Sequence, residues 1–221
     1  MSDAARSVVH LAPLVIAGFF IGGLVGWRAA RFRRLYGRSP IHRPKRGDTS
    51  AHAFLSRMLV VYFGALVALA LAAALVPATL VRVDPLFARR TPALFWGGLV
   101  LATAAAALVW RAQDDMAASW RIGVDPSERT ELVTRGLYQF CRNPIYLGLQ
   151  LALIAFVGLV PGYLTLTLLL TACLLFQVQA RIEEGFLLAH HGDPYARYCH
   201  RVGRFLPWTG RWPEAAPRAD P

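Results

Sequence analysis

Charged side chains are scarce in this chain of 221 residues, at 17% of the total, whereas 56% of the residues are hydrophobic. The mean hydropathy of +0.41 is atypical of a soluble domain and typical of a protein that lies in a membrane. Acidic residues are the scarcest, at 13 against 24 lysines and arginines, for a formal net charge of +11. The basic residues lie in the gaps between apolar runs, so the charge indicates membrane orientation and no nucleic-acid partner.

The sequence also lacks the short motifs of several large enzyme classes. It has no glycine-rich dinucleotide-binding or phosphate-binding loop, no HExxH motif and no GxSxG motif. Cys141, Cys173 and Cys199 have neither metal-ligand nor redox spacing, and we interpret them as structural. His190 and His191 are adjacent, so on a helix their side chains point about 100° apart and cannot easily share one metal. We therefore predict no metal site.

Five apolar runs account for the hydropathy, and each is near the length that a helix needs to cross a hydrocarbon core. The fold that they predict is an all-α integral membrane protein with five transmembrane helices and a cytosolic C-terminal cofactor-binding region. Only Pro161-Gly162 separates the last two runs, which predicts a tight helical hairpin over residues 145–180 with both open ends on one side. The runs are 8–26, 58–76, 93–110, 145–160 and 163–178.

The distribution of basic residues predicts the orientation. If the N-terminus lies outside, the inside segments 28–57, 111–144 and 179–221 hold 20 lysines and arginines, and the outside segments hold 4. By the positive-inside rule, the N-terminus is then outside and the C-terminus is cytoplasmic, in a membrane of the bacterial inner-membrane type. The predicted organisation is a three-helix portion, 1–110, with a basic cytoplasmic loop at 28–57, then a motif region, 111–208, and a flexible tail, 209–221.

Small residues predict close helix packing in two of the spans. Gly18, Gly22 and Gly26 recur every four residues in the first span, a spacing that permits helix association. The run 93–110 is rich in alanine, so we expect it to be buried among its neighbours.

Two polar stretches flank the predicted hairpin at its open ends. The first, ELVTRGLYQFCRNPIYLG at 131–148, ends in Arg142-Asn143-Pro144 and Tyr146, and the second, RIEEGFLLAHHGDPYARYCHRVGRFLP at 181–207, opens with Glu183-Glu184. Carboxylates at the edge of a membrane are costly unless they are paired or face water, so they indicate a functional site. Arg181 could instead pair with Glu184 along one helix. If the hairpin is antiparallel, the two stretches form a pocket suited to a cationic or zwitterionic ligand with an aromatic base.

The joint pattern LVTxGxYxxxRNPxYxG, hairpin, EExxLxxxxGxxYxxYxxxVxRFxP resembles the integral-membrane methyltransferases typified by isoprenylcysteine carboxyl methyltransferase. The phospholipid N-methyltransferases are close relatives of that family, and the resemblance covers about residues 119–208. It implies that S-adenosylmethionine binds in a cytosolic pocket made by the two stretches and leaves as S-adenosylhomocysteine. It also implies membrane lipids as partners and a lipophilic methyl acceptor that arrives from the bilayer.

The resemblance implies roles for particular residues. The implied catalytic residues are Arg142, Glu183 and Glu184, and the residues implied to meet the acceptor are Arg181 and Arg204. The implied cofactor contacts are Leu132, Val133, Tyr138, Asn143, Pro144, Ile145, Tyr146 and Glu183.

The chain departs from the family pattern in two places. Many members have histidine where this chain has Asn143, and a cofactor-contacting histidine of the isoprenylcysteine enzymes falls at Thr130 here. Their acceptor-side arginine aligns near Gln179, although Arg181 is close. These departures leave the cofactor in place and put a prenylcysteine acceptor in doubt.

The function predicted is methyl transfer from S-adenosylmethionine to a lipophilic acceptor at the cytoplasmic membrane surface, most like isoprenylcysteine carboxyl O-methylation. A phosphatidylethanolamine-type phospholipid N-methyltransferase is the first alternative, and a small hydrophobic thiol remains open as acceptor. Two other classes also remain: a non-catalytic membrane protein that binds lipid or nucleotide, and a membrane reductase that uses a nicotinamide cofactor. If the protein is a methyltransferase, we expect it mainly to align the methyl donor with the acceptor and to exclude water, because the sulfonium methyl group is already activated.

Overall fold

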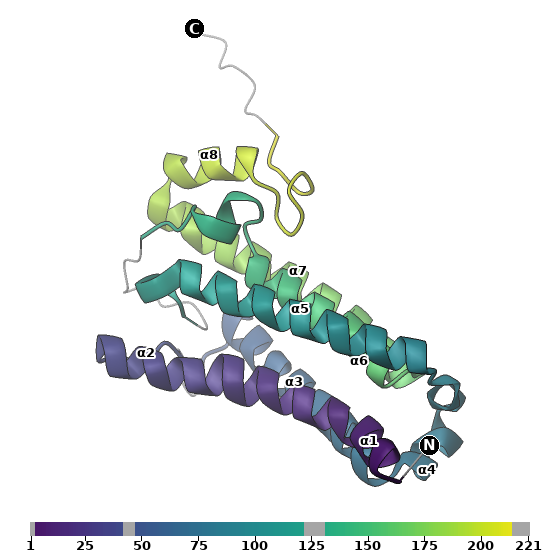
Figure 1. Cartoon of the computed structure of the whole chain (residues 1–221). Coiled ribbons are helices and arrows are strands. Elements are labelled where there is room, and N and C mark those ends of the chain that lie inside the picture. Colours follow the sequence, from purple (N-terminus) through teal and green to yellow (C-terminus); the bar gives the residue numbers. More distant parts are fainter. Residues whose placement is uncertain (1–2, 42–46, 122–130, 214–221) are drawn as a thin grey trace, which may run out of the picture.

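The computed structural model describes residues 3–41, 47–121 and 131–213, with side chains from residue 9 onward. Within these ranges the regular elements are helices, and one isolated bridge joins Cys141 to Gly203. Long helices lie side by side, and α8 (Asp193–Arg201) caps one end of them together with the segment that follows it (Figure 1). The all-α prediction is confirmed.

Four helices in the described ranges are long and apolar enough to cross a membrane. The first span, Val9–Tyr36, is one continuous rod built from α1 (Asp3–Gly18), the π-helix η1 (Phe19–Trp27) and α2 (Arg28–Tyr36). The others are α3 (Ala51–Leu75), α5 (Pro92–Met116, continued by the short η3, Ala117–Ser119) and α7 (Tyr163–His191). Each extends beyond the apolar run that predicted it, because a helix can continue as a polar helix outside the hydrocarbon core.

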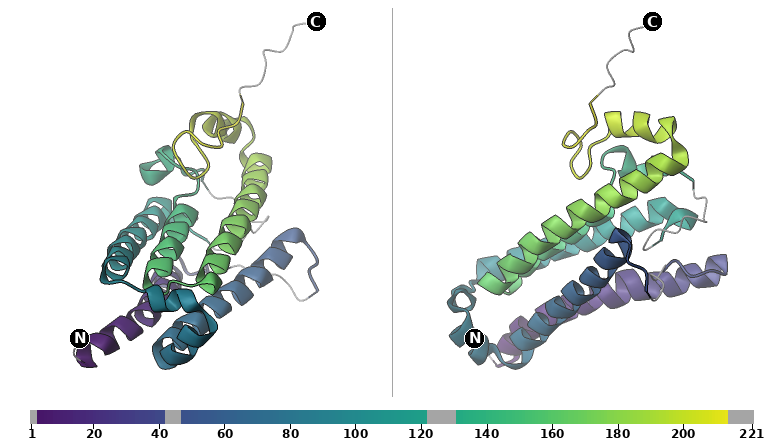
Figure 2. Two further views of the ribbon diagram at one scale, coloured as in Figure 1. Left: turned by 90° about the vertical axis from the view of Figure 1, so that its right-hand side faces the viewer. Right: turned by 180° about the vertical axis from the view of Figure 1, so that it is seen from behind.

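The fourth predicted span, 145–160, is the exception. Helix α6 (Pro144–Leu159) is apolar but has only 16 residues, fewer than the roughly 20 that a crossing requires. It pairs with α7 through a tight turn and packs along α5 (Figure 2). Asp84 follows α4 (Pro77–Val83), precedes η2 (Pro85–Arg89) and accepts a hydrogen bond from Leu164 N at 3.3 Å. A Cβ on Gly162 would lie 2.7 Å from the Asp84 carboxylate, so glycine is needed at that turn.

Small residues bring α5 and α6 unusually close together. A Cβ added at Gly98 would lie 2.8 Å from the carbonyl oxygen of Ala155, and one added at Gly158 would lie 2.8 Å from that of Leu94. Such close backbone approach is how membrane helices gain packing energy. Ala102 and Ala105 of α5 are buried, but Ala104 and Ala107 of the same run are exposed, so the expectation that the run 93–110 is buried among its neighbours holds for one face only. In contrast, a Cβ added at Gly18 or Gly22 would have no atom within 4 Å, so these glycines do not pack inside the described chain.

A polar network attaches the first span to the end of α5. Gln113 donates a hydrogen bond to the carbonyl oxygen of Leu24 in η1 at 2.9 Å, and Arg28 forms an ion pair with Asp114. The rings of Trp27 and Trp110 stack with centroids 5.1 Å apart. The N-terminal helix therefore braces the same turn of α5 that leads into the motif region.

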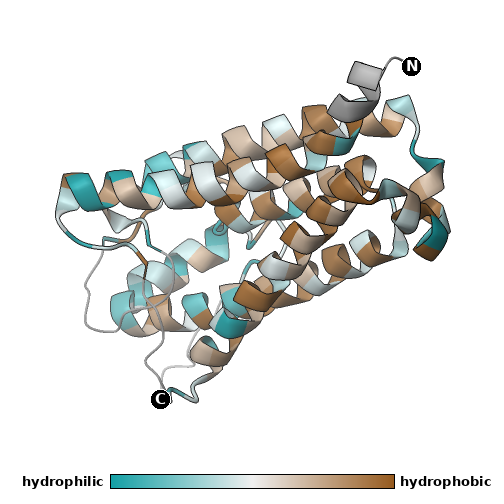
Figure 3. Ribbon diagram, turned by 90° about the horizontal axis from the view of Figure 1, so that it is seen from below, coloured by the Kyte–Doolittle hydropathy of each residue, from teal (hydrophilic) through white to brown (hydrophobic). Residues whose placement is uncertain are grey.

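The ends of the bundle differ in polarity. Figure 3 shows hydrophobic residues along the middle of the long helices and many hydrophilic residues at the end away from the N-terminus. That end holds α2, the last turns of α5 and α7, and the start of α6, whereas α4 and the turn between α6 and α7 lie at the other (Figure 1). Both motif stretches thus meet at the same end, as the hairpin prediction requires.

Candidate functional site

The first motif stretch is fixed to the end of α5 by a buried aspartate. Asp115 accepts a hydrogen bond from the backbone N–H of Leu137 at 2.8 Å and pairs with Arg111 one turn earlier at 3.2 Å. Gly136 has φ +60°, and a Cβ there would overlap the Asp115 carboxylate. Only glycine adopts this conformation without strain and leaves that space. The short helix η4 (Gly136–Gln139) is thereby held in place, and with it Tyr138.

Backbone hydrogen bonds tie the two motif stretches together. Arg142 N donates to Gly203 O at 2.9 Å and Asn143 N donates to Arg204 O at 3.1 Å, around the bridge of Cys141 to Gly203. The Asn143 side-chain amide also donates to Arg204 O, at 3.2 Å. The segment after α8 therefore covers the start of α6.

The Arg142 guanidinium lies at the centre of this junction and is 6% exposed. It makes five hydrogen bonds, two to Glu184 Oε1 and three to the carbonyl oxygens of Cys199, Val202 and Gly210. A guanidinium has five N–H donors, so all of them are engaged within the protein. Arg142 thus has no donor left for a ligand.

Glu184 also pairs with a second arginine, Arg204. Arg204 donates to Glu184 Oε1 at 3.0 Å and to Oε2 at 2.7 Å, while Arg142 pairs with Oε1 at 2.8 Å. Hydrogen bonding to Glu184 raises the pKa of Arg204, so this guanidinium stays charged. The carboxylate is 4% exposed and fully compensated. Arg142, Glu184 and Arg204, here called the arginine clamp, join α6, α7 and the C-terminal segment.

Glu183, the next residue, has a different environment. Its Oε1 accepts hydrogen bonds from the Tyr146 hydroxyl at 2.6 Å and from the Gln179 side-chain amide at 2.7 Å. Both donors are neutral, and no arginine or lysine of the described chain forms an ion pair with Glu183. The Tyr146 ring stacks on Phe176 with centroids 5.3 Å apart and planes 23° from parallel, which fixes the hydroxyl.

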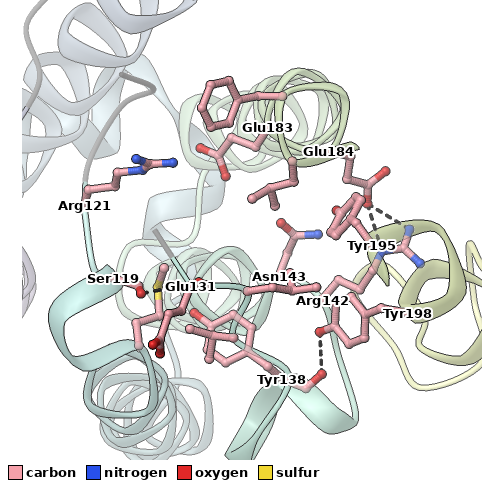
Figure 4. Close-up of a pocket in the computed structure, with 15 residues that line it drawn as sticks. Ser119, Arg121, Glu131, Tyr138, Arg142, Asn143, Glu183, Glu184, Tyr195 and Tyr198 are labelled. Atoms are coloured by element: carbon pink, nitrogen blue, oxygen red, sulfur yellow. Dashed lines mark hydrogen bonds and ion pairs between the residues drawn. The ribbon is translucent and has the colours of Figure 1, made fainter. Parts of the chain in front are cut away.

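A pocket of about 110 Å³ lies between these groups, with Glu183 and Asn143 on facing walls (Figure 4). Its lining combines the polar side chains of Glu183, Asn143 and Arg121 with apolar ones such as Leu132. The Arg121 guanidinium lies over the ring of Phe186, 5.3 Å from its centroid. Burial raises the pKa of Tyr138 well above its usual value, so its phenol stays neutral. The lining residues come from the end of α5, both motif stretches and α8: Met116, Ser119, Arg121, Glu131, Leu132, Val133, Tyr138, Arg142, Asn143, Glu183, Glu184, Phe186, Leu187, Tyr195 and Tyr198.

Most of the predicted site residues meet at this pocket. The ones that line it are Leu132, Val133, Tyr138, Arg142, Asn143, Glu183 and Glu184.

Other predicted residues lie outside it. Pro144 is buried at the first turn of α6, Ile145 follows it, and Tyr146 lies behind Glu183 rather than on the pocket wall. Arg181 is exposed, does not line the pocket and does not pair with Glu184. Thr130 lies outside the described residues. The roles implied for all of these residues stay predictions.

Some pocket residues escaped the sequence analysis. Phe186 and Leu187 follow Glu183 at i+3 and i+4, so helical periodicity would have placed them on its face. Met116, Ser119 and Arg121 carry no such signal, because only the packing of α5 against the motif stretches brings them to the pocket.

Comparisons with known proteins agree with this geometry. Residues 93–193 match the family model described as phospholipid methyltransferase, a little under half of the chain, and the match takes in α5, α6 and α7. The chain is also 36% identical over 72 residues to Methanethiol S-methyltransferase 1 of Bradyrhizobium diazoefficiens, which covers 33% of this chain. The chain spans only about a quarter (25%) of that relative's length. The predicted resemblance to integral-membrane methyltransferases is confirmed.

Proposed function

Because residues 93–193 belong to the phospholipid methyltransferase family, a family of enzymes, we propose that this protein transfers a methyl group from S-adenosylmethionine to a lipophilic acceptor at a membrane surface. One observation carries the proposal: Asn143 and Glu183, from two motif stretches forty residues apart, line one pocket at the open end of the α6–α7 pair. Both residues lie within the segment that matches the family.

The chemistry of the lining fits this donor. Glu183 presents a carboxylate that forms no ion pair within the described chain, which suits a cation. Leu132, Phe186 and Leu187 offer apolar surface for an adenine ring. The pocket is smaller than the roughly 300–1,000 Å³ of typical ligand sites, so a nucleoside ligand widens it on binding.

When bound, S-adenosylmethionine supplies a methyl group already activated on a sulfonium. The protein then needs to orient two reactants and keep water away. The arginine clamp holds the pocket wall, since its hydrogen bonds join α6, α7 and the C-terminal segment. Glu183 Oε2 is the carboxylate oxygen without a hydrogen-bond partner in the described chain, so it is the atom positioned to take a proton from an amine or thiol acceptor.

We further propose that α6 also crosses the membrane, which gives five transmembrane helices in all. Its 16 residues span about 24 Å at 1.5 Å per residue, a little less than a hydrocarbon core of about 30 Å. It runs beside α5 and α7 from the pocket to the turn held by Asp84. Such a short helix places the pocket at headgroup depth, where both a water-soluble donor and a lipophilic acceptor can reach it. The excess of basic residues at the pocket end supports a cytoplasmic location.

The arginine environments favour an amine or thiol acceptor over a prenylcysteine carboxylate. Arg142 has no free N–H group, Arg204 is paired with Glu184, and Arg181 lies outside the pocket. None of the arginines predicted to serve the acceptor is placed to bind a carboxylate. The matched relative is named as a methanethiol S-methyltransferase and the family as phospholipid methyltransferases, which supports thiol and amine as the two classes to test.

Calorimetry on the purified protein in detergent tests the donor. We expect S-adenosylhomocysteine to bind and NADPH not to bind. Binding of NADPH alone would favour a reductase, and binding of neither would favour a non-catalytic lipid-binding protein. Incubation with isotopically labelled S-adenosylmethionine and, in turn, phosphatidylethanolamine, methanethiol and a prenylcysteine then identifies the acceptor. Labelling of the prenylcysteine alone would overturn the acceptor proposal.

A further inference from the structure

We infer that Tyr146 and Gln179 are positioning residues that hold the Glu183 carboxylate toward the pocket without an ion pair among the described residues, and that they thereby favour the cationic methyl donor over its neutral product. This inference rests on the proposed function, because it concerns how the same site distinguishes two forms of one cofactor.

Two neutral donors converge on one carboxylate oxygen. The Tyr146 hydroxyl from α6 and the Gln179 amide from α7 both bind Glu183 Oε1, at 2.6 Å and 2.7 Å. Oε2 has no hydrogen-bond partner among the described residues. A carboxylate with two hydrogen bonds to one oxygen keeps its orientation, and its other oxygen is available to the pocket.

Neither donor is part of the pocket wall. Gln179 is 3% exposed and lies one helical turn before Glu183, and Tyr146 is stacked against Phe176. Both residues therefore act through Glu183 and not by touching a ligand. The side-chain oxygen of Gln179 is buried and has no hydrogen-bond partner among the described residues, so the amide N–H is the group through which this side chain acts.

The Tyr146 hydroxyl and the Gln179 amide are both uncharged, so they orient the Glu183 carboxylate without neutralising it. An arginine at either position would cancel the charge of Glu183, as two arginines do for Glu184. Tyrosine and glutamine instead stabilise the ionised carboxylate and leave its charge for the ligand. At the edge of a membrane the effective dielectric constant is lower than in water, so this charge attracts a nearby cation more strongly.

S-adenosylmethionine carries a positive sulfonium, whereas the sulfur of S-adenosylhomocysteine is an uncharged thioether. The two molecules otherwise present the same groups. An oriented Glu183 therefore binds the donor more tightly than the product, and removal of the methyl group weakens binding at the moment when the product must leave.

The variants Tyr146→Phe and Gln179→Met each remove one donor with little change in shape. We expect each variant to bind S-adenosylmethionine about tenfold more weakly, because a hydrogen bond to a charged group is lost, and S-adenosylhomocysteine less than about twofold more weakly. The matched controls are Tyr62→Phe, whose hydroxyl binds Leu168 O in the membrane core, and Gln177→Met, two residues earlier on α7. Both controls should retain the wild-type ratio of the two dissociation constants.

The outcomes separate this inference from the proposed function. If the wild-type protein binds neither cofactor form, the proposed function fails. If the wild type binds both and the two variants keep its affinity ratio, or lose both affinities equally, the inference is wrong and the function stands. Should Tyr146→Phe unfold, as a lowered thermal midpoint in detergent would reveal, the Gln179→Met ratio decides.

Discussion

Glu183 and Glu184 are neighbours on α7 and differ almost completely in how the fold treats them. Glu184 is 4% exposed, and two arginines cancel its charge. Glu183 is held by a phenol and an amide, and its charge remains for the pocket. Adjacent helical residues point about 100° apart, so one turns toward the C-terminal segment and the other toward the cavity.

The two adjacent glutamates therefore have different roles, although the sequence alone does not distinguish them. A buried carboxylate with two arginines builds a rigid junction between chain segments, and its charge is unavailable to a ligand. A carboxylate held by neutral donors keeps its charge and is suited to binding a cation. The arginine clamp therefore supports the site, and Glu183 belongs to the site itself. Substitutions that exchange these roles test the comparison.

Removal of Arg142 should have the largest effect. We expect Arg142→Met to destabilise the fold by about 4 kcal/mol, since loss of one member of a buried ion pair typically costs about 3–5 kcal/mol. Three backbone carbonyl groups would also lose their donor. Chemical unfolding in detergent measures the change. Arg181→Met, an exposed arginine on α7, is the control and should change stability by less than about 0.5 kcal/mol.

The two glutamates should give opposite results when each is changed to glutamine. Glu184→Gln leaves two arginines without their counter-charge, and we expect a loss of about 2 kcal/mol in stability. Glu183→Gln should change stability little and weaken binding of S-adenosylmethionine by about tenfold, because its charge faces the ligand. Unfolding curves and calorimetry on both variants provide the measurements. Equal effects on stability, or equal effects on donor affinity, would remove the distinction drawn between them.

The turn that carries Tyr138 should show a smaller effect. Gly136→Ala places a methyl group against Asp115 at a positive φ, at an expected cost of about 1–2 kcal/mol. Part of that cost should disappear in the double variant with Asp115→Ala, because the clash is then relieved while the backbone strain remains. A double-mutant cycle on unfolding free energies measures the coupling. Full additivity would show that the carboxylate and the turn do not interact.

Much of the fold could be predicted from the sequence, because apolar runs and basic gaps report directly on membrane crossing. The apolar runs predicted the long helices, and Pro161-Gly162 predicted the hairpin. The run 145–160 already has the 16-residue length of α6, but the same signals did not foresee that α7 continues to His191 and has 29 residues, since the polar end of a helix depends on packing. The π-helix of the first span likewise has no signature in the sequence.

Many residues of the candidate site could be predicted from the sequence, but the role of each residue could not. The motif stretches named Arg142 and Glu184 as chemical groups, yet the arrangement that engages all five guanidinium donors depends on carbonyl oxygens of residues 199–210. Backbone acceptors have no sequence signal. Gln179 was noticed only as a departure from a family pattern, and its hydrogen bond to Glu183 appears once α6 and α7 are in place.

The smallest effect concerns Cys141, which lies on the clamp side of the pocket and donates a weak hydrogen bond to Arg204 O at 3.5 Å. Burial raises the pKa of its thiol to about 11, so the reactive thiolate is rare at neutral pH. We expect iodoacetamide to alkylate it at pH 8 more than a hundredfold more slowly than an exposed cysteine of pKa about 8.5, with the rate rising about tenfold per pH unit up to pH 11. Mass spectrometry of a Cys173→Ala, Cys199→Ala background gives the rate, and the same chain unfolded in detergent gives the reference. Arg142→Met should loosen the arginine clamp and bring the alkylation rate of Cys141 in the folded protein close to that of the unfolded chain. Glu183→Gln should leave the rate unchanged. This difference would show that the protection of Cys141 depends on the clamp and not on the ligand side of the pocket.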